Sequence, residues 1–445
     1  MSASKPMPRA ELKDQAIRAV ELGKQAGASD VWATAGQSRD VEFEYRDGQL
    51  EKVKDTTSQS LALKIYADGR YSTHSTTDLH PERLQDFMRE AVAITRALEP
   101  DEYREITPPE LFADRPHQDL DLVDTTVREL DREQRMAWCR ALDETARDNP
   151  RVISATAGVY DGAGHSASAS SNGFVGEQRS TYCWFGSEVT LKDQGDKRAS
   201  DWFYAGGSHV ADLPDAAGVG GEALARALAR LDAEKGPTLR TTMLVDSRAA
   251  GSLISRLLRP ANARSVQQGQ SFWTGRTGDA LFSSKLGVID DPLIRRGLAS
   301  RHYDEEGISA HRFPLIEDGV VRNIYVDTYY GRKGDLLPTA GTPSNQRVNT
   351  GRYSLDELLR EVGKGVYVTS WLGGNADGTT GDFSLGLRGH MIENGAIGRP
   401  VGEMNVTGNL IDLFANLELV GNDVYPYSAT LSPSLVFRAV DFSGA

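Results

Sequence analysis

Apolar and charged residues alternate in the early part of the chain, and Asp-Gly pairs interrupt this alternation. Residues 41–45 alternate before Asp47-Gly48, and residues 61–65 alternate before Asp68-Gly69. A period of two places apolar side chains on one face of a strand, and Asp-Gly between two such runs is a strong hairpin signal. The pattern therefore predicts an antiparallel meander.

Apolar residues recur at helical spacing elsewhere, which predicts helices. These segments are approximately 12–23, 84–98, 136–146, 222–231, 253–258 and 355–362. Ser, Thr and Gly alternate with other residues from 152 to 189, which predicts long twisted strands, and strands are expected to predominate after residue 238. We therefore predict an α+β protein with mainly antiparallel sheets and flanking helices.

The length of 445 residues excludes a single compact core, because one hydrophobic core stops growing at roughly 250 to 300 residues. Prolines gather between residues 100 and 116, and Gly236-Pro237 ends the alanine-rich helical segment. Both features mark connectors. We expect an N-terminal α+β domain at 1–115, a middle α+β domain at 116–236 and a C-terminal strand-rich domain at 237–445.

Charge and hydropathy exclude several classes of protein. The 63 Asp and Glu outnumber the 50 Lys and Arg, so no broad basic surface for direct nucleic-acid binding is expected. No apolar run approaches the ~18 residues that cross a bilayer, and residues 1–10 lack the apolar segment of a secretory signal. Cys139 and Cys183 are expected to be buried reduced thiols. These features predict a cytoplasmic protein with no membrane partner.

Familiar cofactor and catalytic motifs occur only in fragments. Residues 218–223 match G-x-G-x-x-A, but no buried strand precedes them, which favours the start of a helix over a nucleotide site. No histidine begins a H-E-x-x-H or H-E-x-x-x-H run. The i,i+3 pairs His302 with Glu305 and His390 with Glu393 lie where strand or loop is expected, and ligands at that spacing diverge on a strand. Considered alone, the residues predict no active site.

Short strings stand in a fixed order along the chain. Near the start they are G-A-S-D at 27–30 and I-Y-A-D-G-R at 65–70. Later they are Y-D-E-E-G at 303–307, I-E-D-G-V at 316–320, G-G-N at 373–375, T-G-D-F-S at 380–384, I-E-N-G at 392–395, G-N-L at 408–410 and G-N-D at 421–423. Together these strings resemble the TldD/PmbA family, also called modulator of DNA gyrase.

The resemblance implies the zinc-less branch of that family. Zinc-bearing TldD-type subunits carry H-E-x-x-x-H on a helix of the third domain and a cysteine ligand near the carboxyl end, whereas PmbA or TldE-type subunits lack them. In this chain Ser255, Arg256 and Pro260 stand at the corresponding positions. No histidine occurs between residues 209 and 302, and no cysteine occurs in the third predicted domain. We therefore expect neither metal ligands nor catalytic residues.

The resemblance further implies a non-catalytic subunit of a TldD/TldE-type heteromeric metalloprotease that acts on unfolded or leader peptides. Zinc is expected in the TldD-like partner, and the chain alone is expected to be inactive. An extended peptide can add to a sheet edge, and glycines in a strand allow its backbone to approach closely. The alternative is that the glycines of the segment 373–381 only make turns. The possible peptide-binding residues are Gly373, Gly374, Gly381, Asp382, Phe383, Ser384 and His390.

Two alternatives remain at the level of sequence. One is a homodimeric peptide-binding or regulatory protein without proteolytic activity, and homodimerisation is also expected when the partner is missing. The other is an independent hydrolase with Ser384 or Ser255 as its nucleophile. Ser384 lies in D-F-S-L-G, where Asp replaces the first glycine of a nucleophile elbow, which disfavours this alternative.

Overall fold

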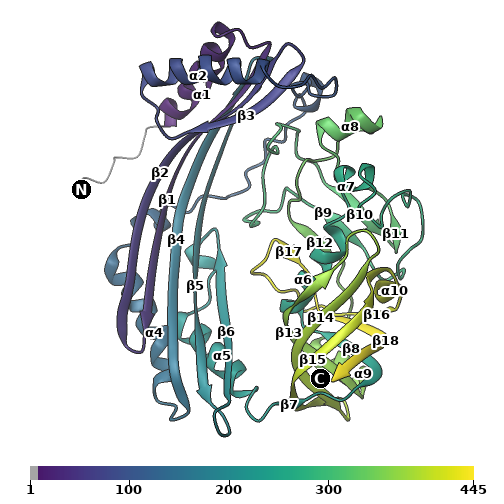
Figure 1. Cartoon of the computed structure of the whole chain (residues 1–445). Helices are drawn as coiled ribbons and strands as arrows, with labels where there is room; N and C mark the ends of the chain where they lie inside the picture. Colours follow the sequence, from purple (N-terminus) through teal and green to yellow (C-terminus); the bar gives the residue numbers. More distant parts are fainter. Residues whose placement is uncertain (1–8, 445) are drawn as a thin grey trace.

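The computed structural model describes residues 9–444, and two bodies of secondary structure face each other (Figure 1). A long six-stranded sheet with helices forms the first body. A seven-stranded sheet, a five-stranded sheet and short helices form the second. The predicted α+β class, with mainly antiparallel sheets and flanking helices, is confirmed.

The six-stranded sheet is antiparallel and has the order β3-β2-β1-β4-β5-β6. Its strands are β1 (Asp30–Arg46), β2 (Gln49–Ala67), β3 (Arg70–Thr76), β4 (Val152–Ser170), β5 (Val175–Lys192) and β6 (Arg198–Gly207). The predicted meander is β1-β2-β3, and Asp47 and Asp68 have the positive φ that its tight turns require. Strands from both sides of residue 115 join in this one sheet.

Two helix pairs cover the outer face of this sheet, one pair at each end (Figure 1). The pairs are α1 (Arg9–Gln25) with α2 (Pro81–Arg96), and α4 (Arg132–Arg147) with α5 (Ala216–Leu228). In β1, Val31 and Ala33 pack beneath the first pair and Phe43 beneath the second. Because strand residues alternate between faces, Thr34 and Ser38 point to the opposite face, toward the second body.

Helix α5 begins at Ala216 rather than near Glu222. The Asp215 carboxylate accepts a hydrogen bond from the Gly218 amide at 2.7 Å and caps the helix there. Gly220 faces α4, where a Cβ atom would lie 2.5 Å from the Leu142 carbonyl oxygen. Close helix packing therefore accounts for glycine within the helix, and the G-x-G-x-x-A string is part of a helix as predicted.

The seven-stranded sheet of the second body has the order β16-β18-β8-β13-β14-β15-β7, and β15 also pairs with β18. Its strands are β7 (Glu234–Lys235), β8 (Leu239–Val245), β13 (Gly365–Ala376), β14 (Asp382–Glu393), β15 (Ala396–Asn409), β16 (Leu417–Val420) and β18 (Leu435–Gly444). The five-stranded sheet has the order β11-β10-β9-β12-β17. Its strands are β9 (Val288–Asp290), β10 (Phe313–Glu317), β11 (Val320–Val321), β12 (Gln346–Val348) and β17 (Thr430–Leu431).

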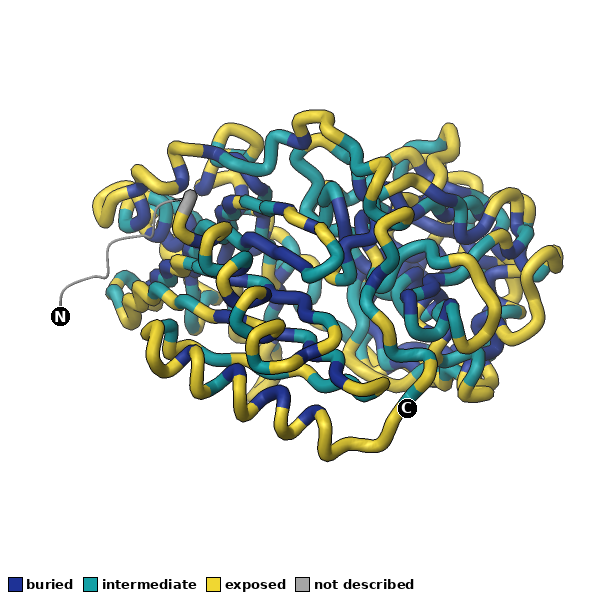
Figure 2. The backbone as a smooth tube through the Cα atoms, turned by 90° about the horizontal axis from the view of Figure 1, so that it is seen from above, coloured by how far each residue is buried: buried dark blue, intermediate teal, exposed yellow. Residues whose placement is uncertain are grey.

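Two helices predicted in this body are confirmed, α6 (Ser247–Leu258) and α9 (Leu355–Val362). Three short helices were not predicted, because five to seven residues hold too little periodicity: α7 (Ala263–Gln267), α8 (Thr328–Gly334) and α10 (Leu410–Ala415). A continuous apolar core joins α6, α10 and the sheets. Buried residues lie inside both bodies (Figure 2).

Two further expectations concern the cysteines and membranes. Cys139 and Cys183 are buried free thiols, as expected, and burial raises the pKa of each thiol to about 12. Within residues 9–444, no helix has both the length and the apolar character that crossing a bilayer requires.

Candidate functional site

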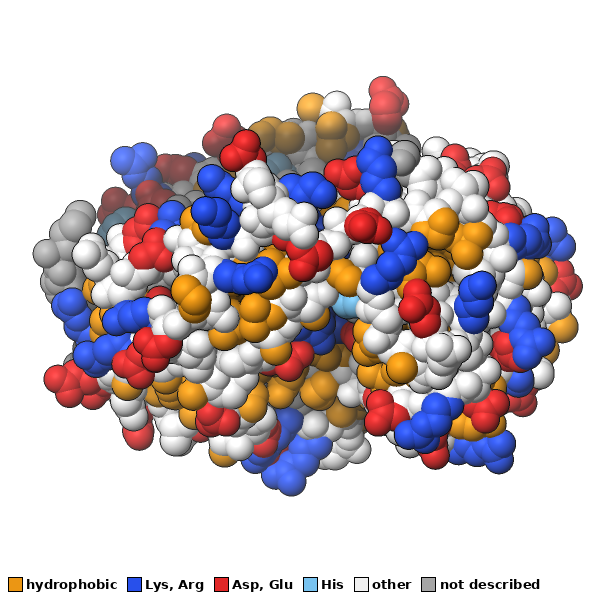
Figure 3. Space-filling model, turned by 90° about the horizontal axis from the view of Figure 1, so that it is seen from below, with side chains coloured by type: hydrophobic (Ala, Val, Ile, Leu, Met, Phe, Trp, Pro, Cys, Tyr) orange, Lys and Arg blue, Asp and Glu red, His pale blue; other side chains and the backbone are white. Residues whose placement is uncertain are grey.

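Three adjacent hollows lie between the inner face of the six-stranded sheet and the second body. The central hollow has a volume of about 1020 Å³, and its neighbours have about 560 and 510 Å³. The central hollow shares Ser166 and Gln178 with one neighbour and Trp184 with the other. We call these three adjacent hollows together the inter-body cleft. Seen from below, the surface is hollowed between the two bodies (Figure 3).

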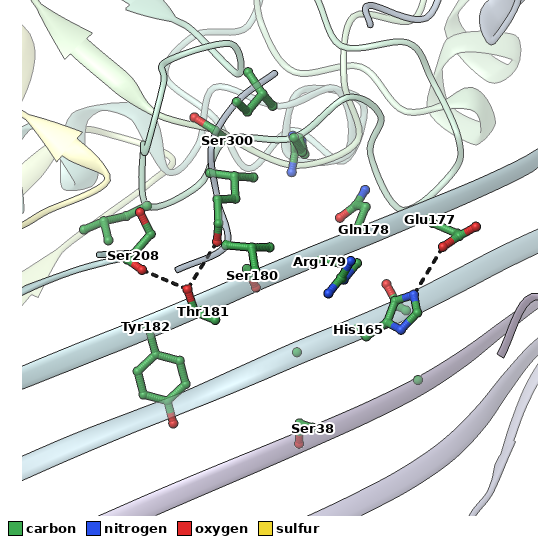
Figure 4. Close-up of a pocket in the computed structure, with 18 of the residues that line it drawn as sticks. Ser38, His165, Glu177, Gln178, Arg179, Ser180, Thr181, Tyr182, Ser208 and Ser300 are labelled. Carbon is green, nitrogen blue, oxygen red and sulfur yellow. Dashed lines mark hydrogen bonds and ion pairs between the residues drawn. The ribbon is translucent and has the colours of Figure 1, made fainter. Parts of the chain in front are cut away.

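Polar side chains line the sheet wall of the central hollow, and loop 297–302 of the second body lines the opposite wall (Figure 4). Loop 119–123 borders the hollow beside β5, where the Thr181 amide donates to the Leu122 carbonyl at 2.9 Å. His165 Nε2 lies 3.3 Å from Glu177 Oε2. The Thr181 hydroxyl donates to the Ser208 carbonyl at 2.8 Å. Hydroxyl groups both donate and accept hydrogen bonds, so this wall can bind the polar groups of a peptide backbone.

Ion pairs hold the two bodies together at this cleft. Asp121 accepts from Arg296 Nε at 2.6 Å and from Arg295 Nη2 at 2.8 Å. The hydrogen bond from Arg296 lowers the pKa of the Asp121 carboxyl, although desolvation opposes this shift. Arg296 also pairs with Asp212 at 2.8 Å. The loop that carries Arg295 and Arg296 is therefore tied to the first body through acidic residues.

The hollow beside α6, which we call the α6 hollow, has walls from both bodies. Strands β5 and β6 contribute Trp184, Trp202 and Tyr204, and the second body contributes Ser247, Arg248, Gly251, Ser252, Ser255, Arg256, Arg259, Tyr425, Tyr427, Ser428 and Thr430. Helix α6 buries Leu253, Ile254 and Leu257 in the core. Ser252, Ser255 and Arg256 lie on its opposite face at helical spacing and line the hollow.

Two of the three positions assigned to a lost zinc motif meet in this hollow. The Ser255 hydroxyl donates to the Gly251 carbonyl at 2.9 Å, and Arg256 Nη1 donates to the Ser252 carbonyl at 3.0 Å. Pro260 does not join them: α6 ends at Leu258, and Pro260 is buried beyond the helix end. The motif was expected on one helix through residue 260, but proline lacks the amide hydrogen that would continue the helix.

The side chains in the α6 hollow do not fit a zinc ion. Among the described residues that line it, none is His, Cys, Asp or Glu, the residues that bind zinc in proteins. Throughout residues 9–444, no three such side chains gather closely enough to hold a metal ion. No catalytic step through a metal follows from these residues.

Gly373 and Gly374 lie within β13 rather than at its end. Their φ angles are 119° and 108°, and the pairing of β13 with β14 is irregular between Trp371 and Gly373. A Cβ atom at 374 would lie 2.1 Å from the Ser384 carbonyl oxygen, so this bulge requires glycine. Gly381, with φ of 86°, lies in the turn before β14.

Beside this bulge, β13 has an open edge. Strand β8 pairs only with residues 365–368, whereas β14 pairs with β13 up to residue 376. Leu372, Gly373 and Gly374 are exposed. Trp371 Nε1 donates to the Ala249 carbonyl of α6 at 3.0 Å, so this part of β13 lies directly beside α6.

The other predicted peptide-binding positions lie along β14. Asp382 and Ser384 are exposed, whereas Phe383 is buried in the core. The Asn409 amide donates to the Asp382 carboxylate at 3.0 Å and lowers its pKa. His390 is buried, and its Nε2 lies 2.9 Å from the Ala229 carbonyl oxygen of the first body. Burial lowers the pKa of His390.

The structure separates Ser384 from His390. Six residues along a strand span about 20 Å, and both side chains belong to β14, so they cannot form a catalytic hydrogen bond. Ser255 has no histidine beside it in the hollow. His390 therefore cannot act as the general base for Ser384, and no histidine lining the hollow can do so for Ser255, which disfavours an independent hydrolase.

Sequence reasoning missed the aromatic wall of the α6 hollow. Trp202 and Tyr204 come from β6, and Tyr425 and Tyr427 come from the loop before β17. Tyr425 donates to the Tyr204 carbonyl at 3.2 Å across the two bodies. These residues are about 220 positions apart in the sequence, and no local pattern connects them.

Three family models match the chain in succession. They are PmbA/TldA metallopeptidase domain 1 at residues 35–95, the central domain at 126–231 and the C-terminal domain at 238–444. Together they cover well over half of the chain. The chain belongs to the PmbA/TldD family. The proposed domain limits near residues 115 and 236 stay predictions.

Relatives match this member of the PmbA/TldD family over nearly its whole length. Metalloprotease PmbA of Escherichia coli O157:H7 is 28% identical over 439 residues, which cover 97% of this chain and 96% of that protein. A metalloprotease PmbA homolog of Haemophilus influenzae is 26% identical over 441 residues, which cover 98% and 96%.

Two solved structures share the arrangement of the whole chain. One, from Bacteroides thetaiotaomicron, is described as a candidate modulator of DNA gyrase. It superimposes on this chain with a TM-score of 0.95 and is 33% identical to it, and the match covers 99% of this chain and 100% of that chain. TldE from Thermococcus kodakarensis has a TM-score of 0.85 at 16% identity, covering 97% and 100%. The second likeness shows the shared fold.

Proposed function

We propose that this chain is the non-catalytic, PmbA/TldE-type subunit of a heteromeric metalloprotease. It holds an unfolded or leader peptide while a zinc-bearing, TldD-type partner cuts that peptide. One observation carries the proposal: where the family's zinc helix is expected, α6 presents Ser255 and Arg256 to a hollow without any metal ligand. The surrounding cleft is nevertheless large enough for a peptide.

The charge of the α6 hollow supports a role other than metal binding. Arg248, Arg256 and Arg259 line it, and guanidinium groups stay protonated at physiological pH. Like charges repel, so the guanidinium groups of Arg256 and Arg259 disfavour a dication at this place. The contribution of this chain to peptide cleavage is therefore its binding surface.

The open edge of β13 supplies a place for an extended peptide. A peptide that adds to a sheet edge bonds through its backbone, which tolerates many sequences, while hollows beside the strand select side chains. Within the described residues, β8 does not pair with β13 beyond residue 368, and Trp371 links this part of β13 to α6, the helix that also lines the α6 hollow. This arrangement suits unfolded substrates of varied sequence.

The partner is inferred from the names of the relatives together with the missing ligands. Relatives that match almost the whole chain are called metalloproteases, yet this chain has no set of zinc ligands in residues 9–444. A TldD-like subunit would supply the zinc. Obligate partners typically bury about 2,000–5,000 Å² of surface in total, which is apolar at its centre, and a chain without its partner can cover such a surface by forming a homodimer.

Elemental analysis and a peptidase assay on the purified chain test the proposal. We expect no stoichiometric zinc and no cleavage of an unfolded peptide by the chain alone. Ser255→Ala should leave the activity of the reconstituted assembly within about threefold, because loss of a nucleophile typically costs several orders of magnitude. About one zinc per chain, lost together with activity on chelation, would overturn the proposal.

A further inference from the structure

The α6 hollow is basic although the chain as a whole is acidic. The formal net charge is −13, yet the hollow is lined by three arginines and no Asp or Glu. One of these arginines is already compensated. Arg248 Nη2 lies 3.3 Å from Asp201, Nη1 donates to the Trp202 carbonyl at 2.6 Å, and the guanidinium lies 4.6 Å from the Trp202 ring centroid.

Arg256 and Arg259 are not compensated in this way. The partly buried Arg256 side chain donates hydrogen bonds to the neutral carbonyl and hydroxyl oxygens of Ser252. Arg259 is exposed at the mouth of the hollow. No ion pair joins either guanidinium to a carboxylate in the described part of the chain, residues 9–444.

The two guanidinium groups influence each other. Burial lowers the pKa of Arg256, and the positive charge of Arg259 lowers it further. Side chains three positions apart are neighbours on a helical surface, and like charges at such spacing destabilise the helix. An anion between the two groups would remove this repulsion and fill their open hydrogen-bonding positions.

Aromatic side chains line the same hollow. The Tyr425 and Tyr427 ring centroids are 5.5 Å apart, and the Tyr425 hydroxyl is held by the Tyr204 carbonyl. Trp184 packs over Gly206, where a Cβ atom would lie 1.9 Å from its ring. The hollow thus combines a fixed aromatic wall with two uncompensated cationic groups.

We propose that Arg256 and Arg259 bind a carboxylate group of the held peptide, and that the aromatic wall receives the side chain next to it. This inference rests on the proposed function and adds the chemistry of the ligand. A guanidinium presents two parallel N–H groups that match the two oxygens of a carboxylate. The carboxylate belongs either to the free C-terminus of the peptide or to an Asp or Glu side chain.

Three synthetic peptides of one length distinguish these sources when titrated into the full-length chain by calorimetry. The first is N-acetylated with a free C-terminus, the second is the same peptide amidated, and the third is the amidated peptide with one Glu. We expect a carboxylate peptide to bind at least about tenfold more tightly than the neutral one, because charge-assisted bonds are the strong ones. Whichever carboxylate peptide shows this gain identifies the source.

Variants then locate the gain. Arg256→Ala/Arg259→Ala should abolish the difference in affinity between the carboxylate peptide and the neutral peptide, and Arg256→Lys/Arg259→Lys should keep part of it. Arg83→Ala/Arg128→Ala removes the same charge from two exposed residues outside the hollow, so it should keep the gain in full. Circular dichroism confirms that each variant is folded.

The outcomes separate this inference from the proposed function. If all three peptides bind the wild-type chain equally well, or if the Ala variant still binds the carboxylate peptide more tightly than the neutral one, the proposed carboxylate site is overturned. The proposal that the chain binds a peptide is not affected by either result. If none of the peptides binds at millimolar concentration, both proposals fall. If the control variant Arg83→Ala/Arg128→Ala also loses the higher affinity for the carboxylate peptide, that affinity arises from the overall charge of the chain. This result would overturn the assignment to Arg256 and Arg259.

Discussion

Asp161→Asn should destabilise the chain strongly, because Asp161 is half of a buried ion pair. Arg135 of α4 and Asp161 of β4 have side-chain exposures of 4% and 2%. Arg135 Nε lies 2.6 Å from Asp161 Oδ2, and Nη2 lies 2.7 Å from Oδ1. Asparagine keeps the shape but removes the charge and one acceptor, which leaves the Arg135 guanidinium buried without a counter-charge.

The expected magnitude follows from this burial. Removal of one partner from a buried pair costs about 3–5 kcal/mol of unfolding free energy, whereas an exposed pair contributes about 0–1 kcal/mol. For a cooperative unit of 150–250 residues, this loss corresponds to a decrease of roughly 6–20 °C in the melting temperature. Asp55→Asn is the matched control, because Asp55 pairs with Arg39 at 2.8 Å but both side chains are about half exposed.

Scanning calorimetry of the wild type and the two variants measures the difference. The first unfolding transition is the relevant one, because a chain of two bodies need not unfold in a single step. Arg135→Met/Asp161→Leu should recover most of the loss, since apolar replacement of both partners removes the uncompensated charge. If Asp161→Asn and Asp55→Asn shift the transition equally, the argument from burial is wrong.

Two further predictions concern the second body. Burial lowers the pKa of His390 below its usual value of about 6.5. Just below that pH, the unfolded chain therefore binds more protons at His390 than the folded chain does. The free energy of unfolding should thus increase with pH up to about 6.5, and the contribution of His390 to it is lost as the pH falls. His390→Gln should reduce that slope in urea unfolding curves from pH 5 to 8, and an unchanged slope would contradict the assignment. Gly374→Ala should destabilise more than Gly373→Ala, because an added Cβ meets a carbonyl oxygen at 2.1 Å in the first and nothing within 4 Å in the second; equal midpoints would show that the close approach is unimportant.

The fold could be predicted where local chemistry is decisive. Asp47-Gly48 and Asp68-Gly69 demand tight turns, and alternation assigns the faces of β1, so the meander followed directly. The start of α5 could not be predicted in the same way. Gly218 and Gly220 argue against a helix until the close packing against α4 is known.

The candidate site could be predicted only in part. The sequence places Ser255 and Arg256 on one helix and rules out a zinc motif there. It cannot show that Trp202 of β6 and Tyr425 of a distant loop meet that helix, because such contacts depend on how the two bodies face each other. The way the two bodies face each other therefore places aromatic rings opposite the arginines of α6, and the sequence alone does not show this arrangement.

The most direct test of the central claim is whether this chain increases the activity of a zinc-bearing TldD-type homologue. Size-exclusion chromatography with light scattering should give about twice 48.5 kDa for the chain alone. After co-expression with the zinc homologue, it should give a two-subunit complex that cleaves an unfolded peptide faster than the homologue does by itself. If no complex forms at micromolar concentrations and the homologue cleaves equally well without this chain, the partner-subunit account is contradicted.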